Sequence, residues 1–374
     1  MPSDARLAIG MMSGTSADGI DAVALSVHDD GMQVLGHHHH RYPAPLQEEL
    51  VAVGREDMAL SAQAYCALDA TVGEHHAAAA TDLLRNCPSA AEAIVIGMHG
   101  QTICHQPPRN TLQIGNAAVV AARTGLPVAC DLRRGDMALG GQGAPLVPPF
   151  HAAAFGAGQR WRVTVNLGGI ANLSWLPPAS GGDITGYDTG PANALMDAWS
   201  QRRRGESCDR GGAWAAGGRV LPDLLAAWLE HPYFAVAPPK STGRGAFHLD
   251  ALFALAGPAD IDDPADVQRT LLELSARTIA DAVKAPNRDP ERVWLCGGGA
   301  YNDALVRRLA ELLAPVPVAS SAQAGIAPEH IEAAAMAWLA LRRLDGLSGA
   351  RASVTGAEAD AVCGALHLPP RRQR

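Results

Sequence analysis

The fold is decided by the stretch LAIGMMSGTSADGIDAVAL, which occupies residues 7–25. Its apolar start leads into glycines and hydroxyl residues that end at Asp18-Gly19, and a second apolar run follows at residues 20–25. Asp-Gly between two apolar runs is typical of a tight hairpin turn. The stretch therefore predicts a β-hairpin at the very start of a domain.

The same pattern returns about half a chain later, in the stretch VTVNLGGIANLSWL at residues 163–176. Two strand patterns again flank a glycine turn, here Gly168-Gly169. Two such hairpins suggest that one fold unit has been duplicated. Other strand and helix patterns alternate around them, which indicates an α/β protein whose sheets are covered by helices. Those strands are expected at residues 93–96, 126–129, 293–296 and 316–318, and the helices at about 194–201, 270–284, 302 onward and 328–344.

The composition of the 374 residues excludes several classes of protein. Only two of the 30 basic residues are lysines, Lys240 and Lys284, and neither stands in a P-loop. A net charge of −8 argues against a nucleic-acid surface. The longest uncharged stretches are interrupted by Gly, Pro and Asn, and residues 1–6 lack a signal-peptide pattern, so we expect no membrane span. Seven cysteines without a C-x-x-C pair favour reduced thiols in a cytoplasmic protein.

The turn of the first hairpin is a candidate phosphate site. Gly14 and Gly19 let backbone amides approach an anion closely, and Thr15 and Ser16 add hydroxyl donors. Asp18 is suited to hold a hydrated cation beside phosphates. An ordinary hairpin with common turn residues is the alternative, and this segment alone slightly favours it.

Gly297-Gly298-Gly299 stands between an apolar strand and a helix, where a phosphate or a flat ring could lie against the chain. A tight strand-to-helix turn is the alternative interpretation. The chain contains no G-x-G-x-x-G motif, so a Rossmann dinucleotide site is not supported.

Asp188 is a candidate general base, because it follows a short strand in a glycine-containing loop. A helix N-cap or an Asx turn would explain the same residue. Further candidates are His99, for a sugar hydroxyl or a strand cap, and the pair Arg133-Arg134, for a carboxylate. A solvated pair is the default interpretation of the two arginines. Glu332 lies in the first turn of its expected helix, where a carboxylate is favoured anyway. The runs 37–40 and 75–76 are histidines without spaced partners, so a polar strand or loop is favoured over a metal site.

Eight motifs occur in order along the chain: Met12-Ser13-Gly14-Thr15-Ser16-x-Asp18-Gly19, His99-Gly100-Gln101-Thr102, Leu112-Gln113-Ile114-Gly115, Gly140-Gly141-Gln142-Gly143-Ala144-Pro145, Asn166-Leu167-Gly168-Gly169-Ile170-Ala171-Asn172, Tyr187-Asp188-Thr189-Gly190-Pro191, Pro239-Lys240-Ser241-Thr242-Gly243-Arg244 and Cys296-Gly297-Gly298-Gly299. This collection closely resembles the bacterial anhydro-N-acetylmuramic acid kinases. The resemblance runs from about Leu7 to Leu366. One departure is Ala192, where the family often has glycine.

The resemblance implies a two-domain, duplicated ribonuclease H-like fold, shared with sugar kinases, actin and the heat-shock chaperones, with ATP in an interdomain cleft. The first domain would comprise residues 1–135 plus about 328–374, and the second residues 136–327. A proline- and glycine-rich stretch, residues 140–149, lies close to the first of these boundaries. The family also suggests a homodimer.

The implied reaction hydrolyses the internal ether of 1,6-anhydro-N-acetylmuramate and phosphorylates its 6-oxygen, with ATP and Mg²⁺, during recycling of cell-wall peptidoglycan. Asp188 would activate the attacking water. His99, Arg133 and Glu332 would contact the sugar, and Asp18 would hold the metal. The implied nucleotide-binding residues are Gly14, Thr15, Ser16, Ala17, Asp18, Gly19, Ile20, Asp21, Gly168, Gly169, Asn172, Gly297, Gly298 and Gly299.

Two other functions stay open on the sequence. One is a phosphatase or ATPase on the same fold, and the other is a non-catalytic sugar or nucleotide sensor. Lys240 lies in a family-like motif whereas Lys284 lies at a helix end, so only the first lysine is expected to matter for kinetics.

Overall fold

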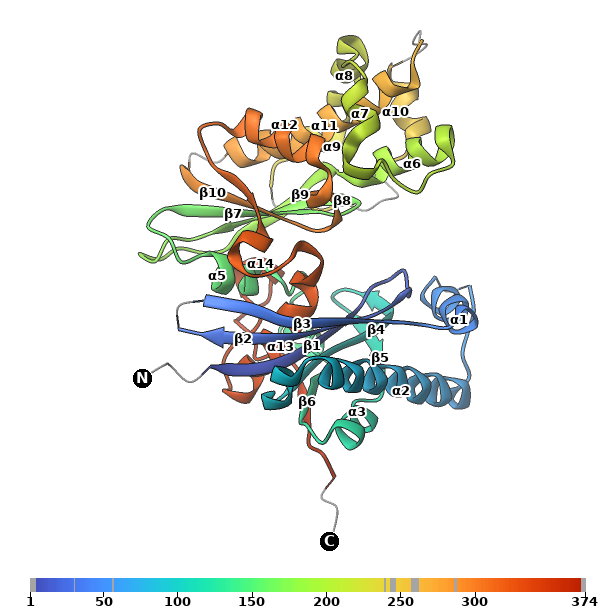
Figure 1. The fold of residues 1–374 in the computed structure, drawn as a ribbon, viewed down its shortest axis with the longest axis vertical. Helices are drawn as coiled ribbons and strands as arrows, with labels where there is room; N and C mark the ends of the chain where they lie inside the picture. Colours follow the sequence, from blue (N-terminus) through green and yellow to red (C-terminus); the bar gives the residue numbers. More distant parts are fainter. Residues whose placement is uncertain are drawn as a thin grey trace. The chain divides into compact units, whose positions relative to one another are not determined.

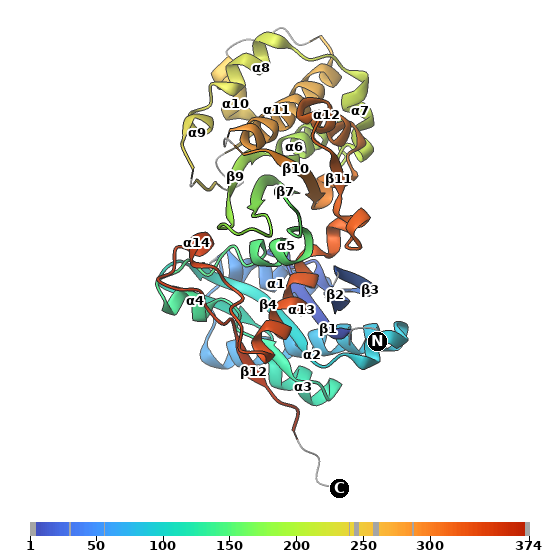
Figure 2. The ribbon, with the colours of Figure 1, turned by 90° about the vertical axis from the view of Figure 1, so that its left-hand side faces the viewer.

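The structure is a computed structural model that describes residues 5–29, 31–55, 57–238, 240–242, 247–256, 262–285 and 288–370. The chain divides into two compact units, each with a sheet and flanking helices (Figures 1 and 2). Unit 1 contains Met1–Phe150, Ala324–Ile326 and His330–Arg374, and unit 2 contains His151–Gln323 and Ala327–Glu329. Within the described ranges, no helix combines the length and the apolar character that crossing a bilayer requires.

The sheet of unit 1 is built on the predicted first hairpin. β1 and β2 pair antiparallel, β3 pairs antiparallel with β2, and β4 and β6 continue the sheet in parallel on the other side of β1. The order is β12-β6-β4-β1-β2-β3, with β5 attached to β4. The strands are β1 (Arg6–Ser13), β2 (Gly19–His28), β3 (Gly31–Arg41), β4 (Ile96–Gln106), β5 (Asn110–Ile114), β6 (Val128–Cys130) and β12 (Ala365–His367).

Helices cover both faces of this sheet. A Cβ atom at Gly10 would lie 1.8 Å from the carbonyl oxygen of Ala333, and one at Gly97 would lie 1.9 Å from that of Met336, so only glycine lets α13 approach the strands this closely. Ile9 and Met11 point to the opposite face and share a buried core with α2. The helices are α1 (Ala44–Gly54), α2 (Ala62–Asn86), α3 (Ala117–Thr124), α4 (Arg134–Ala138), α13 (Ile331–Leu344) and α14 (Ala352–Thr355), with the 3₁₀ turn η1 (Pro88–Glu92).

The sheet of unit 2 repeats that arrangement. β7 and β8 form the predicted second hairpin, β9 pairs antiparallel with β8, and β10 and β11 continue in parallel from β7. The order β11-β10-β7-β8-β9 matches the order β6-β4-β1-β2-β3 of unit 1, which confirms the duplicated, ribonuclease H-like α/β fold. The strands are β7 (Trp161–Leu167), β8 (Ile170–Leu176), β9 (Thr185–Pro191), β10 (Pro290–Cys296) and β11 (Val318–Ser320).

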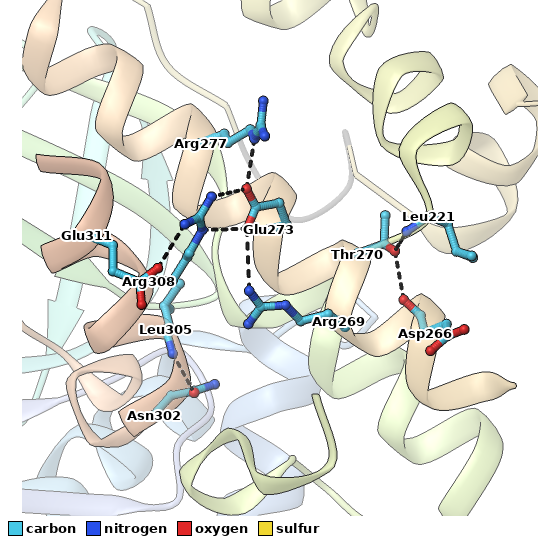
Figure 3. A network of polar contacts seen from close by, with 10 residues as sticks. All are labelled: Leu221, Asp266, Arg269, Thr270, Glu273, Arg277, Asn302, Leu305, Arg308 and Glu311. Atoms are coloured by element: carbon cyan, nitrogen blue, oxygen red, sulfur yellow. Dashed lines mark hydrogen bonds and ion pairs between the residues drawn. The ribbon is translucent and has the colours of Figure 1, made fainter. Parts of the chain in front are cut away.

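The long helix α11 lies at the centre of the helical layer of unit 2 and packs against α6, α7, α8 and α12. Asp263 caps its N-terminus by accepting a hydrogen bond from the backbone amide of Ala265 at 2.8 Å. Most of its residues are buried, including the carboxylate of Glu273 (Figure 3). The helices that lie wholly in unit 2 are α6 (Asn193–Arg204), α7 (Ala213–Gly217), α8 (Pro222–Leu229), α9 (Pro232–Ala235), α10 (Leu249–Ala256), α11 (Pro264–Lys284) and α12 (Asp303–Leu313), with the 3₁₀ turns Arg210–Gly212 and η4 (Gly298–Tyr301). The helix α5 (Pro148–Phe155) and the 3₁₀ turns Ser321–Ala324 and Pro328–His330 span the division between the units in the sequence.

Several elements differ from the sequence expectations. The strand expected at residues 93–96 begins at Ile96 and runs to Gln106. Histidines 75 and 76 lie within α2, not in a strand or loop, because an alanine-rich helix has only a weak apolar periodicity. No helix or strand was expected after Ser348, but this segment contributes α14 and β12 to unit 1.

Unit 1 continues to Phe150, beyond the domain boundary that the sequence places at 135/136. Asp136 is fully buried there, and its carboxylate accepts hydrogen bonds from Thr355 Oγ1 at 2.6 Å and from the backbone amide of Gly143 at 2.8 Å. These two bonds tie α4 and the loop after it to the C-terminal part of unit 1.

Candidate active site

The loop between β1 and β2 has a shape fixed by hydrogen bonds at its base. Ser13 Oγ donates to the carbonyl oxygen of Gly19 at 2.9 Å, and Gln101 Nε2 donates to that of Gly14 at 3.0 Å. Ala17 donates its backbone amide to the same Gly14 oxygen and has a φ of 48°, in the left-handed region. These hydrogen bonds fix the conformation of the loop.

The predicted nucleotide-binding residues of this loop differ in what they can offer. Ser16 Oγ donates to Asp18 Oδ1 at 2.9 Å, and Asp21 Oδ1 lies 2.7 Å from the Nδ1 atom of His39 on β3. The side chains of Thr15, Ser16, Asp18 and Asp21 are exposed, so they can meet a ligand directly. The buried members, which offer a ligand only their backbone, are Ala17, Gly19 and Ile20.

His99 and Arg133 form a tight pair in unit 1. Arg133 Nη2 and Nε lie 2.7 Å and 3.1 Å from His99 Nε2, and Arg133 Nη1 donates to the carbonyl oxygen of Gly143 at 2.6 Å. A guanidinium can only donate, so His99 Nε2 accepts, and His99 Nδ1–H donates to the carbonyl of Gly100 at 2.9 Å. Burial and the charge of Arg133 lower the pKa of His99 to about 3. His99 is therefore neutral at pH 7 and orients the guanidinium.

Glu332 lies on the first turn of α13, also in unit 1, with an exposed side chain. Desolvation raises the pKa of Glu332; the charge of Arg133 opposes this rise and the charge of Asp21 adds to it. The structure thus pairs His99 with Arg133, and the charges of Arg133 and Asp21 both act on Glu332.

Asp188 lies on β9 of unit 2 and is half-buried. Its Oδ2 atom accepts a hydrogen bond from the backbone amide of Thr242 at 2.9 Å. Burial raises the pKa of Asp188, and the bond from Thr242 opposes that rise. A desolvated carboxylate with a raised pKa is a stronger base than one in water, which suits proton abstraction.

Two neighbours, Lys240 and Tyr233, hold the backbone of Asp188. The backbone amide of Asp188 donates to the carbonyl oxygen of Lys240 at 3.1 Å, and Tyr233 Oη donates to the carbonyl oxygen of Asp188 at 2.6 Å. Lys240 Nζ lies 4.7 Å from the centre of the Tyr233 ring and donates to the carbonyl oxygens of Tyr233 and Phe234. Pro239, Gly243 and Arg244, which complete the motif around Lys240, lie outside the described residues.

The second glycine turn, Gly168-Gly169, supports the start of α6. Both carbonyl oxygens accept backbone hydrogen bonds from that helix start, at 2.9–3.1 Å. Asn172, which the resemblance places among the nucleotide-binding residues, is the cross-strand partner of Asp188 in the β8–β9 ladder. Cross-strand partners point to the same face of a sheet, so Asn172 lies beside the candidate base.

Gly298 and Gly299 line a cavity of about 440 Å³ in unit 2, together with Asn193, Asp209 and Tyr301. This volume lies within the range of about 300–1,000 Å³ that is usual for small-molecule sites. A Cβ atom at Gly299 would lie 2.7 Å from that of Leu167, whereas one at Gly298 would meet open space. The triple glycine therefore serves close packing at one position and leaves another open to a ligand.

A family model described as anhydro-N-acetylmuramic acid kinase matches residues 6–369. This chain belongs to that family. Curated relatives with this name include one from Xanthomonas oryzae pv. oryzae (strain MAFF 311018), 46% identical over 371 residues, which cover 97% of this chain and 98% of the relative. Another, from Saccharophagus degradans, is 44% identical over 375 residues, covering 97% of this chain and 99% of the relative.

Solved structures resemble the chain only distantly. A ROK family glucokinase from Streptomyces griseus, in complex with glucose and AMPPNP, matches with a TM-score of 0.40 and 15% identity, over 90% of this chain and 99% of that one. The architecture described above rests on strand order, not on this match.

Several residues that support the candidate site could not be predicted from the sequence. Gln101 stands in the motif His99-Gly100-Gln101-Thr102, but its hydrogen bond to the loop between β1 and β2 depends on the pairing of β4 with β1, which the sequence does not show. Tyr233 carried no signal, because α9 reaches Asp188 only in the folded chain. Ala192, the departure from the family pattern, is fully buried, and its carbonyl accepts a hydrogen bond from Ser275 Oγ at 3.0 Å.

Proposed function

We propose that this chain is an ATP-dependent kinase that opens the 1,6-anhydro bond of 1,6-anhydro-N-acetylmuramate and phosphorylates the freed 6-oxygen. The products are N-acetylmuramate 6-phosphate and ADP. Family membership supports the activity. The observation that carries the mechanism is the half-buried Asp188 carboxylate, oriented by Thr242 and held on its backbone by Tyr233 and Lys240.

Asp188 takes a proton from a water molecule as the water oxygen bonds to the anomeric carbon of the sugar. The bond between that carbon and the 6-oxygen breaks, and its electron pair stays on the 6-oxygen. The 6-oxygen then bonds to the γ-phosphorus in line with the leaving ADP. An aspartate with a raised pKa suits this role, because its target is water and not a sugar hydroxyl.

Unit 1 offers the sugar the guanidinium of Arg133, which is a planar, charged hydrogen-bond donor. The substrate carries a lactyl carboxylate, which an arginine can bind in a bidentate manner. Arg133 is fixed by His99 and by the Gly143 carbonyl, so little side-chain entropy is lost on binding. Glu332 is placed to accept hydrogen bonds from sugar hydroxyls or from the acetamido group.

The β1–β2 loop offers the phosphates of ATP its backbone amides and the hydroxyls of Thr15 and Ser16. The exposed carboxylates of Asp18 and Asp21 are oxygen donors of the kind that Mg²⁺ prefers, so the residues present fit that ion. When bound, Mg²⁺ would neutralise charge on the transferring phosphate. The cavity at Gly298 and Gly299 would take the adenosine.

An assay that follows ADP and sugar phosphate tests this function, with MgATP and the anhydro-sugar as substrates. We expect both products in equal amounts and only when the sugar is present. Asp188→Asn should lower kcat by at least about 10²-fold and leave nucleotide binding intact. Asp183→Asn, at an exposed aspartate of the loop before β9, is the matched control and should keep normal activity.

Two other results would replace the proposal with another function. ADP formed equally without sugar would point to an ATPase or phosphatase. No turnover, combined with sugar or nucleotide binding, would point to a sensor.

A homodimer in solution is the oligomeric state we propose, and sedimentation of the purified chain tests it.

A further inference from the structure

The face of unit 1 that α2 covers carries a cluster of imidazoles and a carboxylate. Strand β3 is the edge of its sheet, and it presents His38 and His40 to the same side, because side chains two residues apart share a face. Helix α2 presents His75 and Asp82 seven residues apart, which is two helical turns and again one face. All four residues are half-buried.

The ligand atoms of this cluster are close enough to share an ion. One ligand atom each from His38, His40 and Asp82 lie within 4.8 Å of one another, and His38 Nε2 is 3.7 Å from Asp82 Oδ2. Ligand atoms bound to one tetrahedral zinc are about 3.3 Å apart, given metal–ligand distances of about 2.0–2.1 Å. Small side-chain rotations therefore suffice to close the set.

Two neighbours orient these ligands. His75 Nδ1 lies 2.9 Å from His40 Nε2 in a hydrogen bond, which fixes the imidazole ring of His40. Arg85 donates to Asp82 Oδ1 at 3.3 Å, so the oxygen that faces His38 is the other one, Oδ2. Such outer contacts are typical of metal ligands, which are usually held by a second hydrogen bond.

We propose that His38, His40 and Asp82 form a binding site for a divalent transition-metal ion of the zinc class, with His75 as a positioning residue. Two imidazoles and a carboxylate suit Zn²⁺ or Co²⁺, whereas Mg²⁺ prefers oxygen ligands alone. The ion clamps the edge strand β3 to α2. On the opposite face of the same strand, His39 holds Asp21, so the clamp also steadies a residue of the phosphate loop.

Titration of the purified, chelator-treated full chain with Zn²⁺ alone, without ATP or sugar, tests the site. We expect one tightly bound Zn²⁺ per chain, together with a rise in thermal midpoint. His38→Asn and His40→Asn should each weaken Zn²⁺ binding at least tenfold, and the midpoint of the metal-free protein should stay near that of the wild type. His37→Asn and His39→Asn change the same strand on its other face and should leave Zn²⁺ affinity unchanged.

Cobalt substitution provides a spectroscopic readout of the ligands. Bound Co²⁺ should show visible d–d bands without a thiolate charge-transfer band, and the d–d bands should be lost in Asp82→Asn. His75→Ala should weaken Co²⁺ binding and retain the bands. Three results would overturn the proposal: equal affinity in wild type and His38→Asn, loss of binding in His39→Asn, or a thiolate band from one of the free cysteines.

Discussion

At Asp188 the protein combines two opposing effects on one carboxylate. Burial raises its pKa, and the hydrogen bond from the Thr242 amide works against that rise. The net direction is upward from an ordinary value of about 3.9. The active form is the deprotonated one, because only a carboxylate can accept the proton of water.

We therefore predict an acid limb in the pH profile of kcat/KM. Activity should be full above the raised pKa of Asp188 and should fall with unit slope as pH drops through it, starting at a higher pH than for an ordinary aspartate. Circular dichroism over the same range separates this effect from acid unfolding. A profile that stays flat down to about pH 4 would remove Asp188 from the base role.

Arg133 allows a test of sugar recognition. Arg133→Lys keeps the charge and loses the planar fork that meets His99 and Gly143, so we expect KM for the sugar to rise at least about tenfold while KM for ATP is unchanged. Steady-state kinetics with each substrate varied in turn measures this. Arg134→Lys is the neighbouring control, because that side chain is exposed. Equal rises in both KM values would mean that Arg133 only stabilises the fold.

The two lysines differ in their surroundings. Lys240 Nζ is bonded to two carbonyls of α9 and stacks on Tyr233, whose hydroxyl holds the Asp188 backbone; Lys284 lies in the last turn of α11. Arginine cannot repeat the compact contacts of the ammonium, so Lys240→Arg should lower kcat about two- to tenfold. Lys284→Arg should have no effect on kinetics. Unchanged kinetics in both variants would show that Lys240 is only a surface charge.

At the scale of elements, α11 and α12 are joined by a buried carboxylate (Figure 3). Glu273 is almost fully buried on α11, and it accepts two hydrogen bonds from Arg308 of α12 at 2.7 Å and 2.8 Å and one from Arg277 at 2.8 Å. Burial alone would raise the pKa of Glu273, but these arginines hold it below its ordinary value. The ionised carboxylate therefore stabilises unit 2 at neutral pH and loses this contribution as pH falls through its pKa.

Removing that carboxylate leaves Arg308 partly unpaired between the two helices. Glu273→Ala should lower the free energy of unfolding by about 3 kcal/mol. Glu311→Ala removes the exposed partner of the same arginine and should cost about 0–1 kcal/mol. Urea denaturation of both variants measures the difference, and similar losses in the two would show that burial of Glu273 adds nothing.

At the scale of the whole molecule, the duplicated fold could be predicted because both glycine hairpins are local in sequence and each begins a sheet. The helix α2 could not be predicted in this way, because alanine, glycine and histidine make up much of its buried face and weaken the helical periodicity. The candidate base Asp188 was expected in a loop after a short strand, whereas it lies within β9. Tyr233 and Gln101 were missed because their contacts join segments that are far apart in the sequence.

The histidine cluster could not be predicted from the sequence either, because its residues also come from segments that are far apart in the chain. In the sequence, the run at residues 37–40 has no spaced partners, and the partners that complete the cluster come from a helix about 40 residues later. Strand register and helix phase together place those side chains on facing surfaces, and neither can be read from the run itself.

The most direct test of the proposed mechanism follows the oxygen of water through one turnover. The reaction of MgATP with the anhydro-sugar is run in oxygen-18-labelled water and stopped before the anomeric oxygen exchanges with solvent. We predict one labelled oxygen on the anomeric carbon of the sugar phosphate, and none in its phosphate group. Label in free phosphate, or a sugar phosphate without label, would contradict the claim that water opens the ring while the 6-oxygen takes the phosphate.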